Sequence, residues 1–138
     1  MFEPHSPGSA LAFALDHHRP QQTLVLRICG DADFAHESEL RVVLAAALVE
    51  APKVLIVELS RAFVDVRGLT ALLVLDQQAR RRGVTVILAG ASATLRRIVG
   101  LFRLPGRLPC FGGVAEALAA GQPPERSNPS TAGGPQAA

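Results

Sequence analysis

The chain has 138 residues, which is enough for one domain with a hydrophobic core and too few for two ordinary domains. Hydrophobic residues make up 49% of it but aromatic residues only 4%, so its core must consist of Leu, Val, Ile and Ala, without platforms for stacking nucleic-acid bases. The formal net charge of +2 is too small to steer nucleic acid, and we predict no nucleic-acid partner.

The two ends of the chain differ in composition from the rest. Residues 1–8 contain two prolines and a glycine, and the stretch from Gly121 onward is rich in Pro, Gly, Ser, Thr and Ala. Such segments have too few apolar residues to offset the entropy of ordering, so we predict disorder over 1–8 and 121–138, around one domain over 9–120. Neither a leader-like start nor an apolar run of membrane-spanning length occurs, and we expect a cytoplasmic protein without a membrane partner.

The first half of the domain predicts a hairpin, a helix and a buried strand. A short strand over Ala10–Leu15 and a polar turn over His17–Gln22 lead into Thr23–Cys29, where apolar residues recur with the period of a strand. Glu37–Glu50 has its apolar residues at helical spacing. Val54–Leu59 is a nearly continuous apolar run, which is typical of a central strand covered on both faces.

A second helix and a further strand follow. Asp65 is suited to the N-cap of a helix, because its carboxylate can accept hydrogen bonds from the free amides of the first turn. The helix should end at Arg80–Arg82, with Gly83 in the left-handed position just beyond it. Val84–Ala89 then has the apolar character of another buried strand.

The last part of the domain predicts two more helices. Ser92 should cap a helix that is terminated by Pro105-Gly106, Arg107–Cys110 is a candidate edge strand, and Gly113–Ala120 a final helix. The whole series indicates an α/β domain with a mixed β-sheet of four to five strands and about four helices packed mainly on one face. A doubly wound sheet is the alternative architecture.

Between residues 10 and 120, the order of these elements and three motifs resemble the STAS domain, the fold of bacterial anti-sigma factor antagonists. Gly30–Asp33 is similar to the family's Gly-Glu-Leu-Asp sequence. Asp65–Leu69 is similar to its Asp-Ser-Ser-Gly-Leu helix start, which is the most specific match. The third match is Ala89–Leu101, where a strand gives way to a helix that contains Leu95, Arg96, Arg97 and Ile98.

The resemblance implies a non-enzymatic protein that sequesters an anti-sigma factor with a serine-kinase domain and so regulates sigma-factor-dependent transcription. In the family, phosphorylation of the serine before the motif glycine abolishes docking. Arg67 occupies that position here, Val66 replaces the other serine, and the loop from Ser60 to Asp65 looks one residue short. We therefore expect docking without phosphorylation control, through Asp31, Asp33, Asp65, Val66, Arg67, Gly68 and Leu69.

Several of these positions have two readings. Arg67 is either a solvated side chain that replaced a serine after regulation was lost, or a cation that pairs with a partner's carboxylate. Asp65 serves as a cap first and a contact second, and Asp31 and Asp33 brace a turn or meet a basic partner. A different class of function also remains open, namely a self-associating scaffold, such as a homodimer, or a ligand-sensing STAS module.

Catalytic and cofactor sites are not indicated. The four histidines and two cysteines show no metal-ligand spacing, and neither a G-x-S-x-G elbow nor a glycine-rich phosphate loop occurs. We therefore expect no cofactor, no metal and no enzymatic activity. Thr70 is the hydroxyl closest to the helix start and is held as an alternative phosphorylation site.

Overall fold

A computed structural model describes residues 11–101 and 108–121. The disorder predicted for 1–8 and 122–138 lies outside the described residues, as does the helix terminator at Pro105-Gly106. Gly121 is described and is the last residue of a helix.

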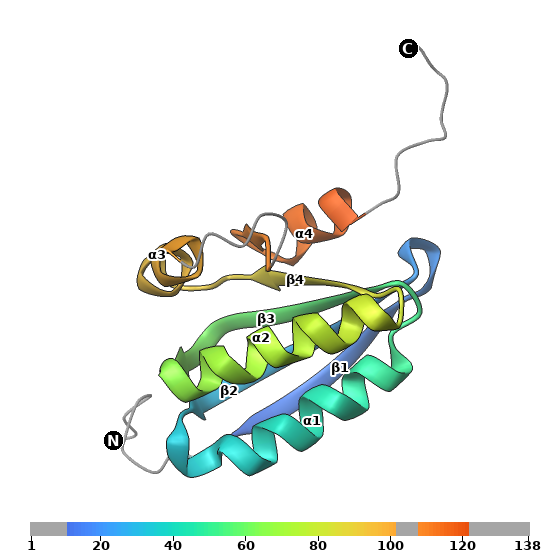
Figure 1. Cartoon of the computed structure of the whole chain (residues 1–138). Coiled ribbons are helices and arrows are strands. Elements are labelled where there is room, and N and C mark those ends of the chain that lie inside the picture. Colours follow the sequence, from blue (N-terminus) through green and yellow to red (C-terminus); the bar gives the residue numbers. More distant parts are fainter. Residues whose placement is uncertain (1–10, 102–107, 122–138) are drawn as a thin grey trace.

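Five strands and four α-helices make up the described part of the chain (Figure 1). Two turns of 3-10 helix, Arg19–Gln21 and Phe34–His36, connect some of them. The elements in chain order are β1 (Ala12–His18), β2 (Thr23–Ala32), α1 (Glu37–Glu50), β3 (Val54–Val64), α2 (Val66–Arg81), β4 (Thr85–Ala89), α3 (Ala93–Leu101), β5 (Cys110–Phe111) and α4 (Val114–Gly121).

The strands form one mixed sheet in the order β1-β2-β3-β4-β5. β1 and β2 are antiparallel, as expected of a hairpin, whereas β2, β3, β4 and β5 are parallel. β3 lies in the middle of the sheet, which confirms the central strand predicted from its apolar run. Parallel neighbours need crossover connections, and α1, α2 and α3 supply them.

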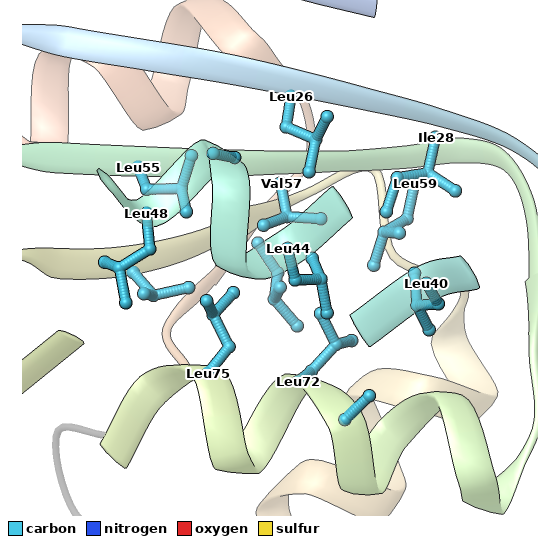
Figure 2. Close-up of a cluster of buried hydrophobic side chains, with 14 of the residues drawn as sticks. Leu26, Ile28, Leu40, Leu44, Leu48, Leu55, Val57, Leu59, Leu72 and Leu75 are labelled. Carbon is cyan, nitrogen blue, oxygen red and sulfur yellow. The ribbon is translucent and has the colours of Figure 1, made fainter. Parts of the chain in front are cut away.

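The main hydrophobic core lies between the sheet and the pair α1 and α2, which run side by side on one face (Figure 1). Leucines dominate it, in keeping with the near absence of aromatic residues. The labelled side chains in Figure 2 come from the sheet and from both helices: Leu26, Ile28, Leu40, Leu44, Leu48, Leu55, Val57, Leu59, Leu72 and Leu75.

A smaller core covers the opposite face of the sheet. Ala117 of α4 is fully buried there against Val25, Ile56 and Ile87. The expected arrangement, a mixed sheet with helices mainly on one face, is confirmed. α4 is the helix that packs on the other face (Figure 1).

The structure differs from the sequence-based expectation at several strand ends. β5 is Cys110–Phe111, so the described residues Leu108 and Pro109 of the expected edge strand precede it. β1 extends to His18, so the predicted turn begins two residues later. β2 and β3 pair as far as Ala32 and Val64, with a register irregularity between Arg27 and Cys29. The expected loop from Ser60 to Asp65 is therefore wrong, because backbone pairing to β2 keeps the chain in the sheet as far as Val64. In the described ranges, no helix is long and apolar enough to cross a bilayer.

Candidate functional site

Two of the motifs meet at the end of the sheet where β2 and β3 finish. Ala32 and Val64 are register partners, and the Asp65 amide donates a hydrogen bond to the Ala32 carbonyl at 3.3 Å. Because the two strands are parallel and adjacent, their carboxyl ends must lie together. The segment after β2 and the start of α2 therefore lie side by side (Figure 1).

Asp65 joins these two segments. Its Oδ1 accepts hydrogen bonds from the amides of Arg67 at 2.9 Å and Gly68 at 3.0 Å. Its Oδ2 accepts one from the amide of Phe34 at 3.2 Å. The predicted N-cap is confirmed, and the same carboxylate also anchors the turn that follows β2.

Asp33 braces that turn. It is the N-cap of the 3-10 helix Phe34–His36, and its Oδ1 lies 3.2 Å from the His36 amide and 2.8 Å from the His36 Nδ1. These contacts match the turn-bracing reading of Asp33. Its side chain stays partly exposed beside the start of α2.

Other predicted site residues are not presented to solvent. Asp31 is 5% exposed within β2, and its Oδ1 has no hydrogen-bond partner among the residues that the structure describes. Leu69 is 3% exposed and belongs to the main core. Gly68 is buried where α2 crosses β2, and a Cβ there would overlap the Ala32 carbonyl oxygen. Its role is close packing of the helix against the sheet.

Arg67 has a partner within the chain. Its Nη1 donates to Oε1 of Glu37 at 3.0 Å, and its guanidinium carbon lies 4.7 Å from the centre of the Phe34 ring. Neither of the two readings derived from the sequence included this contact. The side chain nevertheless remains 51% exposed, so it forms part of the surface.

Glu37 is shared by two arginines. Arg41, one turn further along α1, donates to its Oε2 from Nε at 3.1 Å and from Nη2 at 3.0 Å. The hydrogen bonds of Arg41, together with the charge of Arg67, hold the pKa of Glu37 below its usual value against a smaller opposing effect of desolvation. The site therefore contains a network of one carboxylate and two guanidinium groups.

Sequence reasoning missed Glu37, Arg41 and Phe34 as site residues. The spacing of Glu37 and Arg41, four residues apart on a helix, is a local signal that could have indicated their ion pair. The pair of Glu37 with Arg67 spans 30 positions, and no local pattern indicates it. Phe34 is 66% exposed, and its only signal was an aromatic residue in an otherwise polar turn.

The surface around Arg67 is apolar at its margins. Val66, the residue before Arg67, is 74% exposed. Phe34 follows the end of β2, and its amide donates a hydrogen bond to the Asp65 carboxylate, whereas Val66 follows Asp65 directly as the first residue of α2. We call Phe34, Val66, Arg67 and Glu37 the helix-start surface. An exposed cation flanked by exposed apolar side chains is a composition common in protein interfaces.

We also looked among the described residues for a metal site and for an accessible hydroxyl near the helix start. No group of three His, Cys, Asp or Glu side chains in 11–101 and 108–121 is placed to hold a metal ion. The Thr70 hydroxyl is exposed and donates to the Val66 carbonyl at 2.8 Å, as hydroxyls inside helices commonly do.

Comparisons with solved structures identify the fold. An anti-sigma factor antagonist from Mycobacterium paratuberculosis superposes with a TM-score of 0.71 at 20% identity, covering 84% of this chain and 97% of that one. The anti-sigma factor antagonist SpoIIAA in its unphosphorylated form gives 0.59 at 22%, covering 79% and 94%. A sulfate transporter family protein from Wolinella succinogenes gives 0.60 at 27%, covering 72% and 84%.

No curated protein matches the chain closely enough to add to this comparison. The family model of the STAS domain matches residues 14–117, which is most of the sequence and includes the helix-start surface. The fold that the motifs implied is therefore present, with one five-stranded mixed sheet and a helix that starts at the Asp65 N-cap. This chain belongs to the STAS domain family.

Proposed function

We propose that this chain acts like an anti-sigma factor antagonist. It binds an anti-sigma factor of the serine-kinase type through the helix-start surface and so releases a sigma factor for transcription, as a non-enzymatic protein of the cytoplasm. The observation that carries the proposal is Arg67, which stands exposed at the start of α2 where the family has its phosphorylated serine. Without a hydroxyl at that position, the kinase has no acceptor there, and docking is not switched off by phosphorylation at residue 67.

Electrostatics supports the absence of such a switch. A phosphoryl group adds about −1.5 to −2 charges at the position it modifies. Arg67 places a permanent positive charge at the same helix start, and its contacts with Glu37 and Phe34 hold it on the surface. A partner that docks here meets the same charge at all times.

The test uses the purified chain and the purified serine-kinase anti-sigma factors of its source organism. Titration calorimetry should detect a complex with one of them, and mass spectrometry after incubation with ATP should find no phosphate on the chain. The Arg67→Ser variant is the matched control, because it restores the hydroxyl and should gain phosphate and then lose affinity. Absence of binding to every kinase tested would reject the function, whereas phosphate on the unaltered chain would reject only the lack of control.

A second candidate is a homodimeric scaffold, and one observation favours it. β1 is an edge strand, and beside it a groove of about 380 Å³ is lined by Phe13, Leu15, Leu26, Val42 and Val43. Of these, Leu15 is 46% and Val42 69% exposed. Unpaired edge strands beside exposed apolar residues are prone to self-association.

Light scattering separates the two candidates. A homodimer whose mass stays constant on dilution, and which the Val42→Lys change converts to a monomer, would favour the scaffold if no kinase binds. A monomer at micromolar concentration would exclude it.

A further inference from the structure

Arg67 uses little of its hydrogen-bonding capacity. A guanidinium carries five N–H donors, and within the described part of the chain Arg67 donates through Nη1 alone, to Glu37. Its side chain is 51% exposed, so the guanidinium remains open to a group that approaches from outside. Arg67 can therefore bind a second carboxylate or exchange Glu37 for another one. Besides the bond to Glu37, the structure records one further contact of its guanidinium, with the Phe34 ring, and the exchange would break no others.

Glu37 does not depend on Arg67 for its neutralisation. Arg41 binds Oε2 through two nitrogens, whereas Arg67 binds the other oxygen, Oε1, through one. Arg41 is also the larger cause of the lowered pKa of Glu37. If Arg67 turns away, Glu37 therefore keeps a cation in place, and the exchange leaves no uncompensated charge.

From these contacts we propose that Arg67 exchanges carboxylates on docking: it leaves Glu37 and pairs with an Asp or Glu of the protein partner, while Arg41 retains Glu37. An acidic segment of the partner fits the helix-start surface in two respects. Its carboxylate matches the free donors of Arg67, and apolar side chains beside that carboxylate would cover Phe34 and Val66, which are 66% and 74% exposed. This inference rests on the proposed function, because it specifies how the same surface binds the anti-sigma factor.

The exchange and a purely structural ion pair predict opposite effects of a Glu37 substitution on the affinity for the partner. If Glu37 competes with the partner for Arg67, the Glu37→Gln change should strengthen the complex by about two- to fivefold, the range expected for release of an exposed ion pair. If the pair instead holds Arg67 in its binding position, the same change should weaken the complex. Gln retains the shape and a carbonyl oxygen, so the fold of α1 is not at risk.

The experiment measures dissociation constants by titration calorimetry for the full chain and for four variants against the kinase that binds it. Glu39→Gln is the matched control, since Glu39 lies in the same turn of α1, is exposed, and has no ion pair with either arginine. It removes the same charge and should change affinity by less than the Glu37 variant. Arg67→Gln should weaken binding about tenfold, and adding Glu37→Gln to it should then have no further effect.

The outcomes separate this inference from the function on which it rests. Tighter binding of Glu37→Gln alone, with the gain lost in the double variant, supports the exchange. If the unaltered chain binds but Glu37→Gln binds equally or more weakly, the exchange is wrong and the proposed function stands. If no variant binds any of the kinases, both are wrong.

Discussion

At the scale of single residues, Asp65 and Arg67 show how one helix start combines structure with recognition. Asp65 accepts three backbone hydrogen bonds, two from α2 and one from the turn after β2, so its carboxylate is occupied. Arg67 is a cation in the first turn of a helix, where the macrodipole disfavours it. The nearby Glu37 carboxylate offsets that effect, which explains why an arginine is tolerated at this position.

Replacing Asp65 tests its role as a cap. Asp65→Ala removes the acceptor of all three amides and should lower the free energy of unfolding by about 1–2 kcal/mol, the usual cost of losing an N-cap. Asp65→Asn keeps one carbonyl oxygen for α2 and should cost less. Urea denaturation of the three proteins measures both differences, and equal stability of Asp65→Ala and the unaltered chain would contradict the assignment.

The network around Glu37 should make stability depend on pH. Because its pKa in the folded chain lies below the ordinary value of 4.5, Glu37 stabilises the fold above that pH, and this contribution disappears as pH falls through the lowered pKa. The unaltered chain should therefore be more stable than Glu37→Gln at neutral pH, and the difference should shrink below pH 4.5. Urea midpoints over a pH series measure this, and a difference that is constant with pH would refute it.

At the scale of elements, α2 is placed by its contact with two strands. Gly68 allows the helix to approach the Ala32 carbonyl and the Val64 side chain, which lie at the paired ends of β2 and β3. This approach brings Arg67 within reach of Glu37 and Phe34. The geometry of the helix-start surface therefore depends on a residue that does not itself contact solvent.

Adding a methyl group at Gly68 should disturb this contact. In Gly68→Ala the new Cβ would overlap the Ala32 carbonyl oxygen and lie 2.9 Å from Cγ1 of Val64, and relief of this overlap should cost about 1–3 kcal/mol. Gly100→Ala in α3 is the control, because none of the described residues lies within 4 Å of its added Cβ, and there the change should be neutral or stabilising. Thermal unfolding of both variants measures the contrast.

At the scale of the whole molecule, one sheet separates two cores of unequal size. The larger one unites α1 and α2 with every central strand, and the smaller one lies under α4. The start of α2 and the turn after β2, which carry Arg67 and Phe34, lie at one end of the larger core, where β2 and β3 are paired (Figure 1). Their position is therefore as stable as the packing of α1 and α2 on the sheet.

A cavity in the larger core should destabilise the entire domain. Leu72 is 1% exposed between α2 and the sheet (Figure 2), and Leu72→Ala should lower the free energy of unfolding by about 2–5 kcal/mol. Val49→Ala in α1 is the control, since Val49 is 64% exposed and its change should stay within about 0.5 kcal/mol. Urea denaturation measures both, and similar losses for the two would contradict the described core.

The sequence by itself determined which segments form helices and strands, and it indicated the family. Helix α1 has the bounds predicted from its apolar spacing, and Asp65 caps α2 as expected, because such signals act between residues within one or two turns. It also pointed to Asp33, Asp65, Val66 and Arg67, which the structure brings to the same end of the sheet.

Only the tertiary structure decided how these residues are used. It buried Asp31, Gly68 and Leu69, extended β3 into the expected loop, and joined Glu37 to Arg67 across 30 positions of sequence. Those outcomes depend on which strands become neighbours and where each helix crosses them. Periodicity and capping report the local environment of a residue, whereas the partner of a charged side chain is set by the parallel pairing of β2 with β3.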